Sequence, residues 1–116
     1  MIDERVWAQL REAESTDPGI LEELIRGFRA ETPKILLKVK EAAAAGDADA
    51  LRKAAHNLKG SSGNLGMLRL AAASAELERQ ARAGSVDGAA ALSALVEQEY
   101  ESACRVLEGE LVRFRI

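Results

Sequence analysis

The 116-residue chain is poor in the residues that build metal centres, disulfide frameworks and aromatic cores. It has one histidine and one cysteine, whereas a structural zinc site needs about four such ligands. The single cysteine, Cys104, cannot form an internal disulfide, and we expect it to be a small buried side chain. Aromatic residues make up 3% of the chain, so leucine, isoleucine, valine and alanine must fill the core. From these absences we expect neither a metal nor a cofactor.

Membrane spans, an export signal and a basic block are also missing from the sequence. No apolar run approaches the roughly 20 residues that cross a bilayer, and the first residues lack the basic start and apolar run of a secretory signal. A lone cysteine is consistent with a reducing compartment, so we expect a cytoplasmic protein without a membrane partner. The net charge is −3 and no basic block stands out, which argues against nucleic acid as a partner.

What the chain does contain is helix-forming sequence with apolar residues at helical spacing. It is 47% hydrophobic and 30% charged, and the better helix formers are abundant. Because long helices joined by short turns pack side by side, we expect residues 1–116 to form one all-α domain, an antiparallel four-helix bundle with a short extra N-terminal helix. The predicted helices span about residues 2–14, 18–45, 48–64, 67–83 and 87–114.

Several single residues carry structural expectations within these helices. Thr16 or Asp17 is expected to cap the second helix, with Pro18 in its first turn. Pro33 should kink that helix without ending it, because the apolar stripe continues beyond it. Trp7 is expected to close one end of the core. The acidic residues of the last helix are expected to form mostly a solvated face, while its inner stripe ends at Phe114; these acidic residues are Glu97, Glu99, Glu101, Glu108 and Glu110.

The stretch from residue 54 to residue 66, read as a helix together with the turn before it, has two stripes of different character. The first stripe is expected to face the core and contains Leu51, Ala55, Leu58, Ser62 and Leu65. The second stripe is expected to face water and contains His56, Lys59, Gly60 and Gly63. A glycine inside a helix costs about 1 kcal/mol relative to alanine. Open space, an imidazole and a nearby cation together suit a bulky, anionic phosphoryl group.

The run from His56 to Gly66 reads His-Asn-Leu-Lys-Gly-Ser-Ser-Gly-Asn-Leu-Gly. It resembles the signature of histidine-containing phosphotransfer (HPt) domains, which is close to His-x-Leu-Lys-Gly-Ser-Ser-x-x-Leu-Gly. Segments 28–47 and 70–82 are similar to the helices that flank this signature in the family. The resemblance implies that His56 accepts a phosphoryl group from an aspartyl phosphate on one receiver domain and passes it to another.

The same resemblance implies response-regulator receiver domains and hybrid sensor kinases as partners, with the acidic pocket and Mg²⁺ on the receiver. We expect the receiver to dock over Gly60 and Gly63, with Arg52 and Lys53 on the same face. Lys59 is expected to stabilise the phosphoryl group. Arg52, Lys53 and Arg69 would add positive charge around the histidine, and nearby cations would keep the imidazole neutral and nucleophilic.

Two other functions stay open at the level of sequence, an adaptor that binds a partner through the same face without phosphate and an enzyme that uses His56 as a general base. The glycine-rich run is not a P-loop, because it lacks the Gly-Lys-Ser/Thr ending at the required spacing. No ATP site is visible, so we expect a phosphoryl carrier without its own ATP-dependent kinase activity. We also expect the protein to be a monomer. Ser61 and Ser62 do not fit a nucleophile elbow, and Ser62 is expected to face inward.

Overall fold

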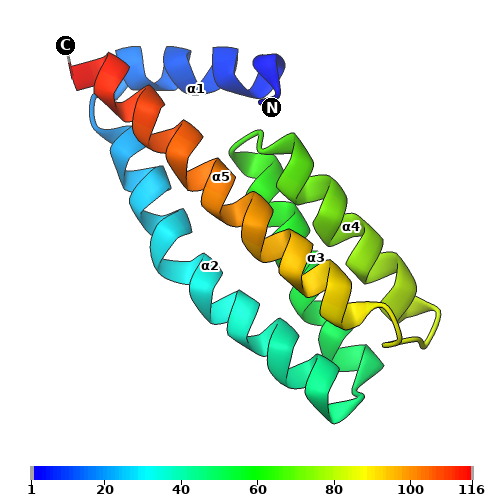
Figure 1. Ribbon diagram of the computed structural model, residues 1–116. Coiled ribbons are helices and arrows are strands. Elements are labelled where there is room, and N and C mark those ends of the chain that lie inside the picture. Colours follow the sequence, from blue (N-terminus) through cyan, green and yellow to red (C-terminus); the bar gives the residue numbers. More distant parts are fainter. Residues whose placement is uncertain (1, 116) are drawn as a thin grey trace.

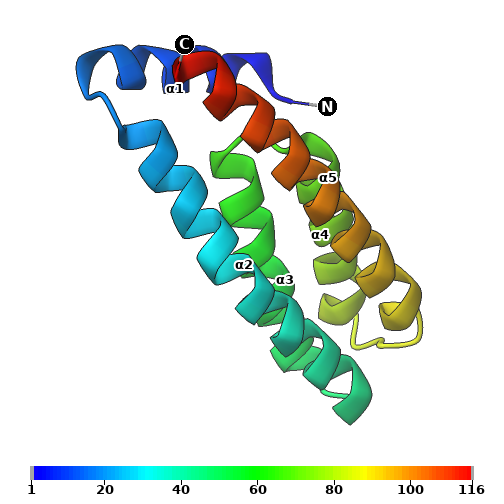
Figure 2. The same cartoon turned by 60° about the vertical axis from the view of Figure 1, so that its left-hand side comes forward.

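A computed structural model describes residues 2–115, and the side chains of residues 2–113, as helices joined by short connections. Four helices run antiparallel and form the expected bundle, while the N-terminal helix lies across one end of it (Figures 1 and 2). The predicted all-α fold is therefore confirmed. Phe114, which we expected to point inward, lies outside the described side chains. The helices are α1 (Glu4–Thr16), α2 (Ile20–Ala45), α3 (Ala48–Asn64), α4 (Leu68–Arg82) and α5 (Ala89–Arg115).

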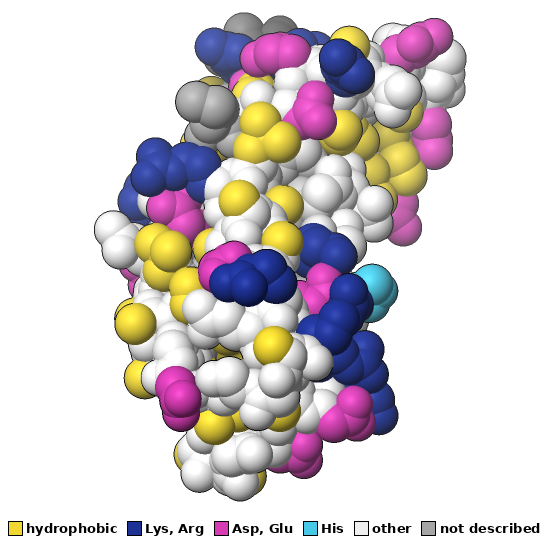
Figure 3. All heavy atoms as spheres, turned by 90° about the vertical axis from the view of Figure 1, so that its right-hand side faces the viewer, with side chains coloured by type: hydrophobic (Ala, Val, Ile, Leu, Met, Phe, Trp, Pro, Cys, Tyr) yellow, Lys and Arg dark blue, Asp and Glu magenta, His cyan; other side chains and the backbone are white. Residues whose placement is uncertain are grey.

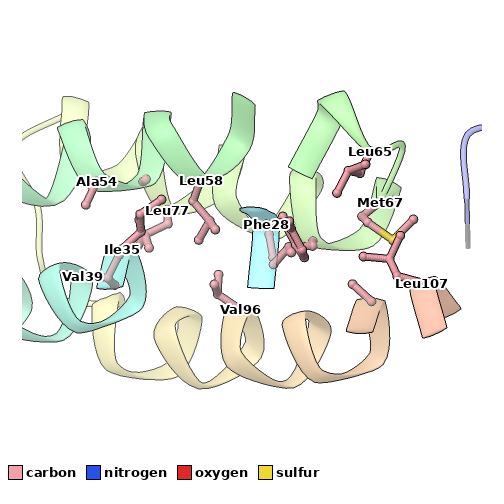
Figure 4. Close-up of a cluster of buried hydrophobic side chains, with 14 of the residues drawn as sticks. Phe28, Ile35, Val39, Ala54, Leu58, Leu65, Met67, Leu77, Val96 and Leu107 are labelled. Carbon is pink, nitrogen blue, oxygen red and sulfur yellow. The ribbon is translucent and has the colours of Figure 1, made fainter. Parts of the chain in front are cut away.

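The core is built from aliphatic side chains that all four bundle helices contribute, as the shortage of aromatic residues requires (Figure 4). On α3 the predicted inner stripe is buried along its whole length. Cys104 is free but only half-buried, less than expected. Among residues 2–115, no helix combines the length and the hydrophobicity that crossing a bilayer requires. Fully buried large side chains include Leu21, Ile25, Leu51, Leu58, Leu70, Leu77 and Leu107.

The start of α2 differs from the prediction because the preceding helix caps it. Asp17 is the C-cap of α1, and Gly19 is the N-cap of α2 with a left-handed φ of 98°. Both oxygens of the Glu14 carboxylate accept backbone hydrogen bonds, from the amides of Gly19 and Leu21. These two amides hold the pKa of Glu14 below its usual value. A carboxylate from α1 thus satisfies donors that Thr16 or Asp17 was expected to satisfy.

The turn between α3 and α4 is fixed by α1, which packs across it. Trp7 is fully buried, and its indole Nε1 donates to the Leu65 carbonyl at 2.9 Å. Gly66 has a left-handed φ of 65°, and a Cβ there would approach Trp7 and Val6 at 3.2 Å. Glycine is therefore required at this position both by backbone conformation and by space. The prediction that Trp7 closes one end of the core is confirmed.

Glu99 and Glu110 correct the prediction for the acidic side chains of α5. Glu97, Glu101 and Glu108 reach solvent, but Glu99 and Glu110 are each only 7% exposed. Glu99 pairs with Arg69 of α4. Glu110 pairs with Arg113 and, at the limit of an ion pair, with Arg11 of α1. These two carboxylates therefore connect α5 to neighbouring helices, because a buried charge requires a partner.

Pro33 lies inside α2, which continues through it as one helix. A proline has no amide hydrogen, so the carbonyl four residues earlier loses its helical donor. That carbonyl belongs to Arg29, and the Tyr100 hydroxyl of α5 donates to it in a long hydrogen bond of 3.4 Å. The tyrosine ring also packs against Phe28, with ring centroids 5.5 Å apart. A side chain from α5 therefore supplies the donor that the proline removes.

This pairing predicts non-additive effects on stability. Tyr100→Phe keeps the ring and removes only the hydroxyl, so it should lower the free energy of unfolding by about 0.5–1.5 kcal/mol. In a Pro33→Ala background the amide at position 33 can donate to the Arg29 carbonyl. Tyr100→Phe should then lower the free energy of unfolding by less than it does in the wild type. Urea unfolding of the four proteins measures the coupling. Equal costs of Tyr100→Phe in both backgrounds would show that the hydroxyl does not compensate for the proline.

Candidate functional site

His56 projects from the outer face of α3 near the middle of the bundle. Asp47 is the N-cap of α3, and its carboxylate accepts from the Ala50 amide, while Gly46 ends α2 in a left-handed conformation. The His56 side chain is 64% exposed. Figure 3 shows the histidine at the edge of the molecule, beside a group of Lys and Arg side chains. The imidazole is therefore accessible to a partner and carried on a rigid element.

Gly60 and Gly63 leave the surface beside the histidine open. Both lie on the exposed face of α3, and a Cβ added at either position would meet no atom within 4 Å. Neither glycine has a positive φ, so neither is needed for backbone geometry. Packing and conformation thus give no reason for glycine here, and the open space itself is the feature that distinguishes this face.

A buried carboxylate lies under the histidine, on α4. Glu78 has 4% of its side-chain surface exposed, and its Oε2 is 2.7 Å from His56 Nδ1. Lys59 Nζ donates to Oε1 at 2.6 Å, and Arg82 donates to Oε2 at 3.1 Å. Three groups on two helices thus satisfy one carboxylate, as a buried charge requires.

The state of Glu78 determines which imidazole nitrogen carries the proton. The hydrogen bond from Lys59 does most to hold the pKa of Glu78 below its usual 4.5, with a smaller effect from His56, while burial acts in the opposite direction. At neutral pH the carboxylate is therefore ionised and can only accept hydrogen bonds. Nδ1 of a neutral His56 must then carry the proton, which leaves the lone pair on Nε2.

The cations around the histidine differ from those expected. Lys59 is only 39% exposed and is bound to Glu78. Arg69 pairs with Glu99 of α5 instead of supporting His56, and Arg82, which the sequence did not single out, takes that place. The direct partner of the ring is consequently an anion, Glu78, which the sequence-based expectation of surrounding cations did not include.

The remaining predicted site residues lie on the same helix at different depths. Arg52 and Lys53 both pair with Asp49, at 3.1 and 3.2 Å, one turn before the histidine. Ser61 and Ser62 each donate to the Leu58 carbonyl, and Ser62 is fully buried as predicted. Their hydroxyls serve the helix backbone, so neither is placed as a nucleophile for a histidine base.

Sequence reasoning missed Glu78 and Arg82 for a physical reason. Helical spacing correctly predicts that Leu70, Ser74 and Leu77 face inward. Glu78 follows this stripe directly and has Arg82 at i+4, a pattern that reads as an exposed ion pair. Only the rotation of α4 against α3 places the glutamate under the histidine.

Within residues 2–115, no group of three or more His, Cys, Asp or Glu side chains is arranged to hold a metal ion.

Comparison with known proteins gives a consistent result. The sequence profile of the Hpt domain matches residues 23–106. The crystal structure of histidine-containing phosphotransfer protein B from Pseudomonas aeruginosa PAO1 is similar over 97% of this chain and 95% of that one, with a TM-score of 0.85 and 35% sequence identity. No curated protein matches the sequence.

The geometry predicts that Lys59 supports the fold as well as the site. Lys59→Ala leaves Oε1 of a buried carboxylate without its donor, which should lower the free energy of unfolding by about 1–3 kcal/mol. Lys34 pairs with Glu31 on the surface, so the control Lys34→Ala should change the free energy of unfolding by less than about 0.5 kcal/mol. Denaturant unfolding at neutral pH compares the two, and equal effects would mean that Lys59 makes only a surface ion pair.

The lowered pKa of Glu78 also predicts how stability depends on pH. A carboxyl group with a depressed folded-state pKa stabilises the fold above its unfolded value and loses that contribution as pH falls through the folded value. The stability difference between wild type and Glu78→Gln should therefore be constant near neutrality and shrink below about pH 4.5. Unfolding measured from pH 7 to pH 3 tests this. A difference that grows in acid would contradict an ionised Glu78.

Proposed function

This chain belongs to the Hpt domain family, and from that premise we propose that His56 is the residue that carries the phosphoryl group. The protein is a histidine phosphotransfer component of a phosphorelay. His56 is the only histidine in the chain. The observation that best supports the assignment is the bond between its Nδ1 and buried Glu78, because that bond leaves Nε2 exposed with a free lone pair.

The chemistry follows from this arrangement of atoms. The Nε2 lone pair attacks the phosphorus of an aspartyl phosphate in line with the bond to the aspartate. The N–P bond forms as that P–O bond breaks, and the aspartate leaves as a carboxylate. Nδ1 keeps its proton, so positive charge develops on the ring. The Glu78 carboxylate lies 2.7 Å from Nδ1 and stabilises that charge.

Transfer onward reverses these steps. The carboxylate of a second receiver attacks phosphorus, the N–P bond breaks, and the imidazole leaves as a neutral ring that still has its Nδ1 proton. Lys59 and Arg82 contribute positive charge near the phosphoryl group, and Glu78 fixes where both side chains lie. The protein's contribution is positioning and fixed charge, which are the main sources of catalysis in phosphoryl transfer.

The partners follow from the same proposal. The donor and the acceptor are receiver domains, including those attached to hybrid sensor kinases. They dock over Gly60 and Gly63, where the surface is open, with Arg52 and Lys53 at the edge of the contact. The protein acts as a monomeric carrier in the cytoplasm and has no ATP-dependent kinase activity of its own. The presence of a single histidine, with an exposed imidazole, supports the role of carrier.

Phosphorylation assays test the assignment of His56. Phosphoramidate, a small donor that needs no docking surface, should label the wild-type protein, and the label should be stable in base and labile in acid. His56→Gln should fold and stay unlabelled with phosphoramidate or with a phosphorylated receiver. ATP and Mg²⁺ alone should leave the wild type unlabelled. Label that persists in His56→Gln would move the site elsewhere, and labelling by ATP alone would reveal a kinase.

Gly60 allows access and folding to be tested separately. Because a Cβ there meets nothing, Gly60→Ala should stabilise the protein by roughly 0.4–1 kcal/mol. Gly60→Leu should fold too, but its side chain would project over the preceding turn toward the imidazole. It should slow transfer from a receiver, with thermal unfolding as the control for folding. Wild-type transfer by Gly60→Leu would exclude docking over this glycine.

A further inference from the structure

The negative charge on Glu78 is more than the orientation of His56 requires. Any hydrogen-bond acceptor at that position would keep the proton on Nδ1, and the neutral amide of a glutamine contains such an acceptor. Burying a carboxylate costs more free energy than burying an amide, and Glu78 has only 4% of its side-chain surface exposed. Control of the tautomer therefore accounts for an acceptor under the ring but not for a charge there.

The charge acts on the ring once a phosphoryl group is attached. An imidazole that donates from Nδ1 is neutral, but with phosphorus on Nε2 the same proton makes the ring a cation. If the ring lost that proton, the Nδ1 lone pair would face the Glu78 carboxylate at 2.7 Å, and both atoms can only accept hydrogen bonds. The carboxylate therefore favours the protonated form of the phosphorylated ring.

Other charged groups surround this contact on both sides of α3. Among the described residues, the ring makes its one ionic contact with Glu78. Lys59 of α3 and Arg82 of α4 bind the same carboxylate, and their positive charges oppose protonation of the ring. The α2 side contributes opposite charges, because Lys38 and Glu41 both line the groove that extends to Asn57. Replacing only the carboxylate leaves all these charges in place and so isolates its effect.

The phosphorylated ring is also open to water. The His56 side chain is 64% exposed, and a Cβ at Gly60 or Gly63 would meet no atom within 4 Å. Neither glycine has a side chain that could cover the phosphorus. The surface that gives a partner access to the histidine therefore gives water access too.

A proton on Nδ1 decides how easily the ring leaves phosphorus. In hydrolysis the water oxygen attacks phosphorus, the N–P bond breaks, and the bonding electron pair returns to Nε2. Inorganic phosphate keeps both protons of the water, and the ring leaves as a neutral imidazole that retains its Nδ1 proton. A ring without that proton would have to leave as an anion, which is a much poorer leaving group.

We infer that Glu78 sets the lifetime of the phosphorylated protein and makes it short, so that the phosphoryl group is either passed on promptly or lost to water. This inference rests on the proposed function, because it takes Nε2 of His56 to be the phosphorylated atom. Glu78 is then a positioning residue that also limits how long the signal persists. The protein is suited to passing a phosphoryl group on and not to storing one.

The test follows the loss of the phosphoryl group in the wild type and in Glu78→Gln. Both proteins are phosphorylated with phosphoramidate, which is then removed, and ³¹P NMR records phosphohistidine and released inorganic phosphate. Glutamine keeps the size and the acceptor but not the charge. An opposite charge within about 4–6 Å shifts a protonation equilibrium by about tenfold or more. Near neutral pH the phosphoryl group should therefore last about tenfold longer in Glu78→Gln.

The pH profile separates an effect of charge from an effect of packing. In acid the phosphorylated ring is protonated with or without the carboxylate, so the two lifetimes should converge as pH falls from about 8 to about 4. Glu76→Gln is the matched control, because Glu76 lies on the same helix but pairs with Arg79. Its lifetime should equal that of the wild type at every pH.

A second measurement needs no variant and therefore does not depend on the folding of Glu78→Gln. Urea unfolds the phosphorylated wild type and removes Glu78 from the ring. Near neutral pH the folded protein should lose its phosphoryl group faster than the unfolded chain, although folding usually protects a group from water. The two rates should approach each other in acid.

Equal lifetimes in the wild type and a folded Glu78→Gln would overturn the inference, and so would a difference that is the same at every pH. A folded wild type that keeps its phosphoryl group longer than the unfolded chain near neutral pH would also overturn it. Failure of the proposed function looks different, because the wild type would then take no label from phosphoramidate.

Discussion

The buried carboxylate of Glu78 is the constraint on which the site depends. A charge with 4% of its side-chain surface exposed needs donors, and three side chains supply them. Two donors come from α3 and one from α4, so the same contacts that stabilise the charge join the two helices. They also give the imidazole one orientation and one tautomer. Stability and the proposed chemistry thus depend on the same set of hydrogen bonds.

The rest of the fold keeps the outer face of α3 rigid and open. α1 closes one end of the bundle, where Trp7 binds the Leu65 carbonyl next to the turn at Gly66. The Tyr100 hydroxyl of α5 donates to the Arg29 carbonyl of α2, which Pro33 leaves without its helical donor. A site on the middle of a helix in a packed bundle holds its side chains more closely than a loop would.

The parts of this structure that could be predicted from sequence are those that local pattern determines. Gly46 and Asp47 end one helix and begin the next as their residue types require, and the two stripes of α3 follow from helical spacing. Trp7 also lies where the apolar periodicity places it, and α2 continues through Pro33 as the unbroken apolar stripe predicts. The HPt signature correctly identified the family because it joins several unusual residues in one short run.

The parts that could not be predicted depend on contacts between helices. Glu14 caps α2 from α1, so the expected cap residues had no such role. In the sequence, Glu99 and Glu110 resemble ordinary surface acids, and only the rotation of α5 against its neighbours shows that they are buried. The same is true of Glu78, because its role can be predicted only when the residue of α4 that lies under His56 is known. Periodicity identifies the inner face of a helix but not the partner of a residue at its edge.

The most direct test of this account is to determine which imidazole nitrogen carries the phosphoryl group. The ¹⁵N and ³¹P NMR spectra of the phosphorylated protein, labelled with ¹⁵N-histidine, resolve the two nitrogens of the single histidine. If Glu78 holds Nδ1, phosphorus must be bonded to Nε2, and Nδ1 must stay protonated and hydrogen-bonded. Phosphorus on Nδ1, or an Nδ1 without its proton, would contradict the role given to Glu78.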